Sequence, residues 1–308
     1  MPKSKAKTTR PVISRRGLCA EKSRLASYKI SCGVYTERSE RARNDKSRET
    51  EIALAICADD AARIAKNIAA LRALGAYRLE PQPTQNIRDI HFDTRDHALQ
   101  KQKLALRIRE RDSETLITLK GPSQKTASGA QERMEIEARW SPVALTRVLR
   151  ELNTRGIVVK ISPRDFARAE PHATLARLGF RAIQKRTTRR QIRHVVPRDA
   201  PRKTVDAELA IDAVTFRFGR QRVHLREIEI EAKHAQARLG DLARQFETMF
   251  APALRVWYGK LTTGRAIQVL LEQGVLQELL DDENNLTPRA YDRIERELGG
   301  GGWDTQLG

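Results

Sequence analysis

The feature that most constrains the fold is a six-residue segment, 226–231, in which charged and aliphatic side chains alternate. In a β-strand, successive side chains point to opposite faces of the sheet. Glu227, Glu229 and Glu231 therefore share one face, and the two isoleucines between them share the other. The segment is predicted to be a strand with one acidic face and one apolar face.

The same alternation recurs in four other segments of the chain. They are Leu106–Arg109, Thr118–Lys120, Arg133–Glu137 and Glu208–Asp212. Each strand taken alone fits an ordinary sheet that buries its apolar face and exposes its charged face to water. Acids recur on some strands and bases on others, however, which is unusual for surface strands. Taken together, the five segments favour a barrel with a polar lumen and aliphatic outer faces covered by helices.

The remaining sequence alternates short strand-like runs with a few helical stretches. Strands are expected over residues 49–56, 104–109, 115–120, 132–140, 186–196, 205–218 and 223–233, with a loop around Pro81 and Pro83. Helices are expected over about 59–73, 142–154, 163–178, 235–250 and 263–273, and from about 287. This order predicts an α+β fold in which one closed antiparallel β-barrel has helices packed outside it.

Three parts of the chain differ in composition. Residues 1–47 are rich in Lys, Arg and Ser and hold roughly half of the formal net charge of +19. Such a segment buries too little apolar surface to order itself, so we predict a disordered basic arm. Residues 48–275 hold the predicted tunnel domain. Residues 276–308 are predicted to form a polar helical and Gly-rich extension.

The positive charge predicts anionic partners. The arm could dock on nucleic acid or another polyanion, act as an organelle transit sequence, or be a solvated tail without a specific partner. The three cysteines show no metal-binding spacing and favour free thiols in a reducing cytoplasm. No apolar run approaches the roughly 20 residues that a membrane-spanning helix needs. The oligomeric state stays open.

Segregated acidic and basic strands suit a site that holds cations on one wall and the oxygens of an anion on another. Hard cations such as Mg²⁺ bind carboxylate oxygens and bridge to phosphate. Arg and Lys neutralise the remaining phosphate charge, Arg through its planar fork. The six histidines are scattered, and no phosphate-binding glycine motif follows a strand, so zinc and P-loop chemistry have little support.

Seven short motifs follow one another along the chain. They are His91–Asp96, Leu104–Arg109, Thr118–Pro122, Arg133–Glu137, Glu208–Asp212, Glu227–Glu231 and Gly259–Leu261. In this order they resemble the core of the CYTH superfamily, the triphosphate tunnel metalloenzymes, over about residues 49–272. The resemblance implies a closed tunnel of eight antiparallel strands that binds a triphosphate-containing anion with Mg²⁺ or Mn²⁺. Members hydrolyse inorganic or thiamine triphosphate, or cyclise ATP.

The resemblance also implies roles for individual positions. Phosphate oxygens would be bound by Arg107, Arg109, Lys120, Arg133 and Lys260, and by Arg189 or Arg190, between which the strand register leaves the choice open. The metal would be held by Glu51, Glu135, Glu137, Glu208, Glu227, Glu229 and Glu231. The catalytic residues would be Glu229, Glu231 and Lys260. Hydrolysis would proceed by attack of a positioned water while metal and basic residues stabilise the developing charge.

The first strand departs from the family pattern, Glu-x-Glu-x-Lys. One alignment keeps Glu51 and places Ala53 and Ala55 at the other two positions, whereas a shift of two residues recovers Glu49 and Glu51 but not the lysine. In both alignments the two alanines are expected to face the lumen. Losing such groups costs several kcal/mol of transition-state stabilisation, roughly as for one preorganised donor. The sequence therefore leaves two functions open: a metal-dependent triphosphatase, or a relative that only binds polyphosphate, nucleotide or nucleic acid.

Overall fold

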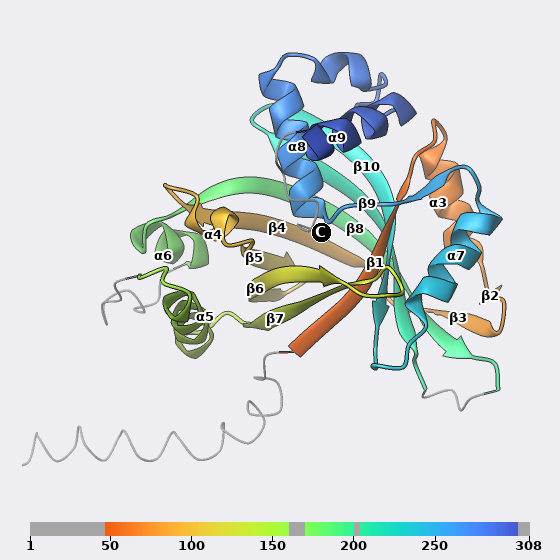
Figure 1. Cartoon of the computed structure of the whole chain (residues 1–308), viewed down its shortest axis with the longest axis horizontal. Helices are drawn as coiled ribbons and strands as arrows, with labels where there is room; N and C mark the ends of the chain where they lie inside the picture. The colour runs from red at the N-terminus through yellow and green to blue at the C-terminus, as the bar shows by residue number, and fades with distance from the viewer. Residues whose placement is uncertain (1–46, 160–169, 200–203, 301–308) are drawn as a thin grey trace, which may run out of the picture. The chain divides into compact units, whose positions relative to one another are not determined.

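The computed structural model of the chain describes residues 47–159, 170–199 and 204–300. Within these residues, antiparallel strands curl into a barrel, and helices pack on its outer face and at one end (Figure 1). Residues 1–46 of the predicted arm, 163–169 of one predicted helix and 301–308 of the Gly-rich extension lie outside the described residues. The α+β barrel expected from the sequence is confirmed, and the domain boundaries stay a prediction.

Eight strands close the barrel, and each is antiparallel to both of its neighbours. Their order is β8-β4-β5-β6-β7-β1-β10-β9, after which β9 pairs again with β8. The strands are β1 (Ser47–Ile56), β4 (Gln85–Thr94), β5 (Ala105–Arg111), β6 (Glu114–Lys125), β7 (Gln131–Arg139), β8 (Phe180–Pro197), β9 (Ala207–Phe218) and β10 (Gln221–Ala232). Closure removes the free edges that an open sheet would expose.

Three short strands extend the sheet beyond the closed ring. β2 (Ala73–Leu74) pairs with β3 (Tyr77–Pro81), and β3 pairs with the last residues of β8. β11 (Leu254–Val256) pairs with the end of β1. Strand β3 replaces the loop that Pro81 suggested, because this proline stands at the last position of the strand.

Seven α-helices lie within the described residues. They are α3 (Ala61–Ala70), α4 (Ala98–Lys101), α5 (Pro142–Thr154), α6 (Pro171–Arg177), α7 (Leu239–Met249), α8 (Lys260–Glu272) and α9 (Pro288–Gly300), with a 3₁₀ turn η2 (Leu276–Leu279) between the last two. Helix α5 has the predicted bounds because the Ser141 hydroxyl accepts a hydrogen bond from the Ala144 N–H (3.1 Å) and Pro142 follows the cap. Helix α3 ends earlier than expected because the chain turns into β2.

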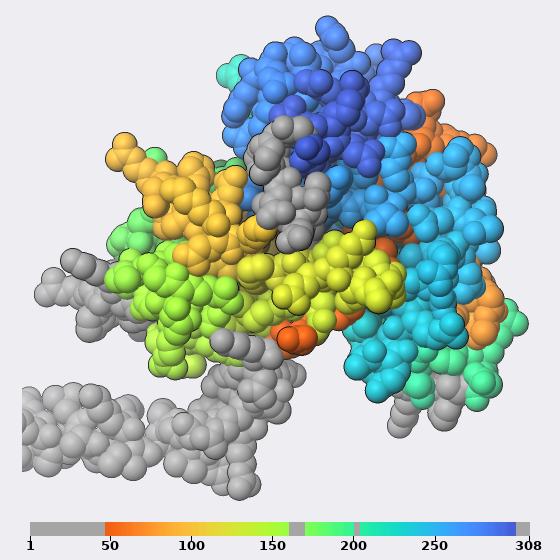
Figure 2. Space-filling model, in the orientation of Figure 1, coloured from red at the N-terminus to blue at the C-terminus, as the bar shows by residue number. Residues whose placement is uncertain are grey.

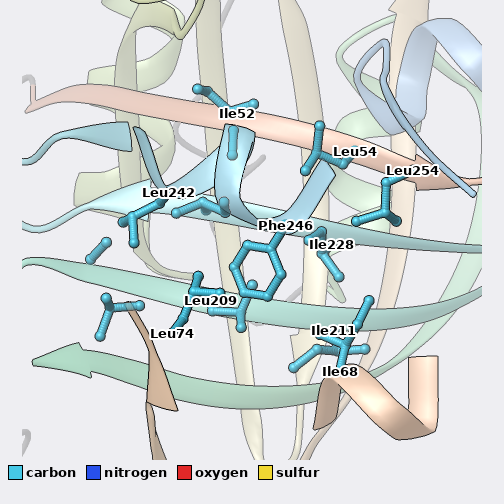
Figure 3. Packing of buried hydrophobic residues seen from close by; sticks show 14 of the residues in the cluster. Ile52, Leu54, Ile68, Leu74, Leu209, Ile211, Ile228, Leu242, Phe246 and Leu254 are labelled. Atoms are coloured by element: carbon cyan, nitrogen blue, oxygen red, sulfur yellow. The ribbon is translucent and has the colours of Figure 1, made fainter. Parts of the chain in front are cut away.

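The aliphatic outer faces of the strands are buried under helices. Ile52 and Leu54 of β1 and Ile228 of β10 pack with Phe246 of α7 (Figure 3). A second cluster joins the outer faces of β4 to β7 with α5. Each such aliphatic side chain contributes roughly 1.5–3 kcal/mol when fully buried. The alternation in the sequence thus sends one face of each strand into a helix-covered core and the other into the lumen.

Helices α8 and α9 fill one end of the barrel. Toward this end the lumen side of β9 and β10 changes from acidic to apolar, and Phe216 and Leu225 join a buried cluster with Ile267 of α8 and Tyr291 of α9. In the space-filling view the two helices form one blue lobe (Figure 2). The lumen is therefore sealed here by apolar packing. None of the helices in the described ranges is long and apolar enough to cross a membrane.

Gly264 allows α8 to approach the strands closely. A Cβ at this position would press against the side-chain amide of Gln184 and the ring of Phe216. We expect Gly264→Ala to lower the free energy of unfolding by about 1–3 kcal/mol, the usual cost of overpacking. Urea unfolding measures this change. Gly299→Ala is the control, because a Cβ there meets nothing within 4 Å. A Gly264→Ala midpoint equal to wild type would contradict the close packing.

Candidate active site

A charged cavity of about 320 Å³ occupies the lumen of the barrel. Among the described residues, eleven basic and seven acidic side chains line it. The predicted acidic and basic strands therefore do face one shared space. The excess of basic side chains gives this space a positive balance, which favours an anionic ligand.

One buried carboxylate organises three arginines on the basic wall. Asp89 of β4 is 1% exposed, and its two oxygens accept hydrogen bonds from Arg109 at 2.8 and 3.0 Å. Arg186 of β8 donates to the same carboxylate at 2.9 Å, and Arg107 lies 3.8 Å away. Burial alone would raise the pKa of Asp89, but the three guanidinium groups outweigh it and hold the pKa well below 3.8. Asp89 stays ionised and aligns the arginines.

The first strand contributes two carboxylates to the lumen. Glu49 accepts a hydrogen bond from the Lys120 ammonium (2.6 Å) and another from Arg133 (2.9 Å). Arg133 also donates to Glu51 at 2.5 Å. Because Glu49 and Glu51 both line the cavity, the structure has the alignment Glu49-x-Glu51-x-Ala53. The acidic half of the first-strand motif is present and its lysine is not.

The two alanines of β1 do not line the cavity. Ala53 lies opposite Glu229 on β10, and Ala55 lies opposite Glu227. Both alanines are buried, and Ala55 belongs to the apolar cluster that seals the barrel end. Both alanines therefore lie on the lumen face of β1, as expected, but Ala55 belongs to the sealed apolar end and neither alanine lines the cavity.

Lys260, at the start of α8, enters a cluster of three carboxylates. Its ammonium lies 2.9 Å from Asp212, 2.6 Å from Glu229 and in contact with Glu227. The three carboxylates approach within 4.8 Å of one another. Arg190 of β8 donates to Asp212 at 2.9 and 2.7 Å and also to Glu229. Lys260 lines the cavity, where its ammonium has three carboxylate partners, and its expected role in phosphate binding stays a prediction.

The acids of this cluster differ in pKa. Burial raises the pKa of Glu227 to about 7, against the opposing influence of Lys260. Burial would also raise the pKa of Glu229, but Lys260 and Arg190 outweigh it and keep the pKa well below 4.5. Glu229 therefore remains ionised near neutral pH, whereas Glu227 titrates there.

A pair of acids with raised pKa lies across β1 and β10. Glu51 stands directly opposite Glu231. Burial raises the pKa of Glu51 to about 7, with Arg133 opposing the shift. Burial also raises the pKa of Glu231, and Lys233 opposes it. Both carboxyl groups line the cavity, so two acids with raised pKa values face its contents, and Glu51 titrates near neutral pH.

The remaining predicted acids also line the cavity. Glu135 lies 3.3 Å from Lys120. Glu137 accepts a hydrogen bond from the Thr118 hydroxyl at 2.9 Å. Glu208 lies 3.5 Å from Lys233, which also contacts Glu231 at 3.0 Å. These carboxylates thus have basic or hydroxyl partners within the lumen.

The structure separates the predicted residues into two groups. All line the cavity except Glu227, which is fully buried beside it, and Arg189, which is exposed on the opposite face of β8 from Arg190. Of these two arginines it is Arg190 that faces the cavity, and its role in phosphate binding stays a prediction. Sequence reasoning gave no role to several polar or charged residues of the lumen and its walls, namely Asp89, His91, Lys103, Arg111, Arg186, Lys233 and Arg265. Asp212 was placed on the lumen face by the alternation of Glu208–Asp212 but was given no role.

A signal for three of these residues was present in the sequence. Asp89 and His91 alternate with isoleucine and phenylalanine along β4, and Arg186 is four residues before Arg190 on the same face of β8. No sequence pattern marks Asp89 as the partner of three arginines, because their strands are joined only by the fold.

Comparison with protein families identifies residues 61–253 as a CYTH domain, and this match spans more than half of the 308 residues. The chain belongs to the CYTH family. The matched region holds most of the CYTH barrel but begins after β1 and ends before α8. The structure adds Glu49, Glu51 and Lys260 to the same lumen.

Solved structures of similar proteins share low identity with this CYTH chain. A putative adenylyl cyclase from Hippeastrum, described as having a dominant triphosphatase activity, is 18% identical, with a TM-score of 0.45; the alignment covers 71% of this chain and 95% of the other. A putative adenylate cyclase from Bacillus halodurans is 19% identical, with a TM-score of 0.37 and coverage of 70% and 96%. The S. pombe RNA triphosphatase is 11% identical, with a TM-score of 0.30 and coverage of 89% and 97%. A search of curated proteins found no match.

Removing the Asp89 charge tests its role in the basic wall. In Asp89→Asn, three buried guanidinium groups lose their shared carboxylate. We expect the free energy of unfolding to fall by about 3–5 kcal/mol, as for a broken buried ion pair. Urea unfolding measures the fall, with the exposed Asp59→Asn as control. Equal losses in the two variants would contradict the proposed arrangement.

The raised pKa of Glu227 predicts a pH-dependent stability difference. Between its ordinary value of 4.5 and about 7, the folded state binds more protons at this group than the unfolded state. Its contribution to stability therefore falls as pH rises through this range and levels off above about 7. Glu227→Gln lacks this loss, so its melting temperature minus that of wild type should increase from about pH 5 to pH 7. A difference that stays constant with pH would contradict the raised pKa.

Proposed function

We propose that this CYTH domain binds a triphosphate group in its lumen together with a divalent cation and hydrolyses a phosphoanhydride bond. The observation that carries the proposal is the lumen itself, where eleven basic and seven acidic side chains surround a cavity of about 320 Å³. This space is large enough for a small ligand. Its combination of bases and carboxylates suits an anion bound together with a hard cation.

The basic wall would hold the phosphate oxygens. Arg107 and Arg109 stand on one face of β5, and Arg186 reaches the same carboxylate, Asp89, from β8. Guanidinium groups fixed in this way lose little freedom when they bind phosphate, and each presents a planar fork of donors. Lys120 and Arg133 face the cavity from β6 and β7. Substrate would be oriented by side chains that are already in place.

The carboxylates fit a hard divalent cation such as Mg²⁺ or Mn²⁺. Glu135 and Glu137 on β7 and Glu229 and Glu231 on β10 all present oxygen donors to the cavity. The pKa of Glu229 is held low, so this group would offer a charged oxygen at neutral pH. Bound there, the cation would neutralise charge on the phosphate oxygens. The deeper cluster around Glu227 is the less suitable place, since Lys260 already occupies it.

Glu51 and Glu231 are the best candidates for accepting the proton of the attacking water. Both face the cavity and both have raised pKa values, and general bases work best when their pKa lies near the working pH. The water oxygen would form a bond to phosphorus as the anhydride P–O bond breaks, and its proton would pass to a carboxylate. The leaving phosphate would carry away the electron pair of the broken bond. Because Glu229 stays ionised, it would orient the attacking water and balance the charge of the cation.

The pairing of Lys260 and Arg190 with the inner carboxylates also supports the alternative function. These ion pairs neutralise charge that a catalytic cation would otherwise balance. In that case the lumen binds a polyphosphate or nucleotide without turning it over. The two functions share the basic wall and differ in whether phosphate is released.

Phosphate release from inorganic triphosphate, with Mg²⁺ or with Mn²⁺, tests the proposal. We expect metal-dependent release by wild type, and a loss of about 10²-fold or more in Glu231→Gln and in Glu51→Gln, the scale of removing a positioned catalytic group. The exposed Glu278→Gln should behave as wild type. Folded wild-type protein that binds triphosphate but releases no phosphate with either metal would establish the binding function instead.

A further inference from the structure

The outer face of β8, β9 and β10 carries a row of three cations. Lys185 on β8 lies directly opposite Arg217 on β9, and Arg217 lies directly opposite Arg222 on β10. All three side chains are exposed. Side chains paired across neighbouring strands lie about 5 Å apart at their Cβ atoms, so three like charges repel one another along this row.

A second set of cations lies further along the same strands. Arg189 of β8 and Arg226 of β10 flank Ala213 of β9. Between the two rows, Thr187, Thr215 and His224 form a polar row, in which the Thr215 hydroxyl and His224 Nδ1 are 2.8 Å apart. The outer face of β8 to β10 therefore has a row of cations, a row of small polar groups and a second row of cations. We call it the basic face.

Within the described residues, this arrangement has no acidic counterpart on the same strands. The outward positions of the basic face hold Lys, Arg, Thr, Ala and His, and no ion pair there involves Lys185, Arg189, Arg217, Arg222 or Arg226. Acids lie only at its borders: Glu110 pairs with Arg88 at 3.4 Å, and Asp281 and Glu283 lie near His224. Toward the other end of β9 and β10 the outer positions are isoleucine and leucine under α3 and α7. The exposed cations thus begin where the helical cover ends.

We propose that the basic face binds the phosphate backbone of double-helical nucleic acid. The two cation rows are four residues apart along each strand, which is about 13 Å at a rise of 3.3 Å per residue. The major groove of B-form DNA is about 12 Å wide, so each row can meet the phosphates of one strand across the groove. A linear polyphosphate has no second strand held at a fixed spacing, so it lacks this geometric match to the two rows.

The composition of the basic face indicates how it contacts the duplex. Its outward positions include no Phe, Tyr or Trp on which an unpaired base could stack. Lysine, arginine and threonine side chains are typical donors to phosphate oxygens, and such contacts carry no sequence information. Binding is therefore sequence-independent and strongly salt-dependent. Anion binding would also relieve the repulsion within the first row. This function is separate from the lumen and does not rest on triphosphate hydrolysis.

Fluorescence anisotropy of a labelled DNA duplex of about 20 base pairs, close to two helical turns, tests the proposal with the full chain. The patch variant carries Lys185→Gln, Arg217→Gln and Arg222→Gln. The control variant carries Lys66→Gln on α3, Arg72→Gln in the turn after α3 and Arg150→Gln on α5, all at exposed positions. Both variants lose the same net charge, so any difference between them comes from position.

We expect the patch variant to bind the duplex at least tenfold more weakly than the control variant at roughly 0.1 M salt. The slope of log K against log salt should become shallower by about 3 for the patch variant only, since three phosphate contacts are lost. Its urea midpoint should stay at or above that of wild type, because repulsion is removed. Equal weakening of the two variants would overturn the proposal and show that net charge alone governs binding. Inorganic polyphosphate that competes as well as duplex DNA at equal phosphate concentration would also overturn it.

Discussion

The barrel depends on the pairing of buried charges inside its lumen, between neighbouring strands and with the start of α8. An isolated ionised group inside a protein costs several kcal/mol, and only a well-placed partner offsets that cost. Asp89 meets this constraint with three guanidinium groups, and Lys260 meets it with three carboxylates. The two centres have opposite charge arrangements, one an acid among three bases and the other a base among three acids, and β8 takes part in both. Together they hold β4, β5, β8, β9, β10 and the start of α8 in one arrangement.

The same pairs determine what the lumen can bind under the proposed function. A phosphate group would compete with carboxylates for arginine and lysine, and a divalent cation would give those carboxylates another partner. The anion would free carboxylates that can bind the cation, and the cation would free basic side chains that can bind the anion. Each ligand would therefore favour binding of the other. The basic face on the outside of β8 to β10 differs in this respect. Its cations have no internal carboxylates within the described residues, so an external polyanion is their natural partner.

Much of the fold could be predicted because its strands carry a period of two. The segments around Arg107, Glu135 and Glu229 form strands with charges toward the lumen, and α5 has the bounds that Ser141 and Pro142 indicate. Strand β3 was missed because its pairing with β8 is a long-range contact beside two prolines. The hub role of Asp89 was missed for a similar reason: its partners come from β5 and β8, far apart in the sequence.

The sequence by itself determined which residues share a face, because alternation along a strand is a local property of the backbone. It therefore specified a charged lumen, a helix-covered outer face and most of the charged residues that line the cavity. Only the tertiary structure decided the register of β1, the choice of Arg190 over Arg189 and the partners of Lys260. Those depend on which strands become neighbours and where α8 enters the barrel, and neither is encoded in the spacing of residues along one segment.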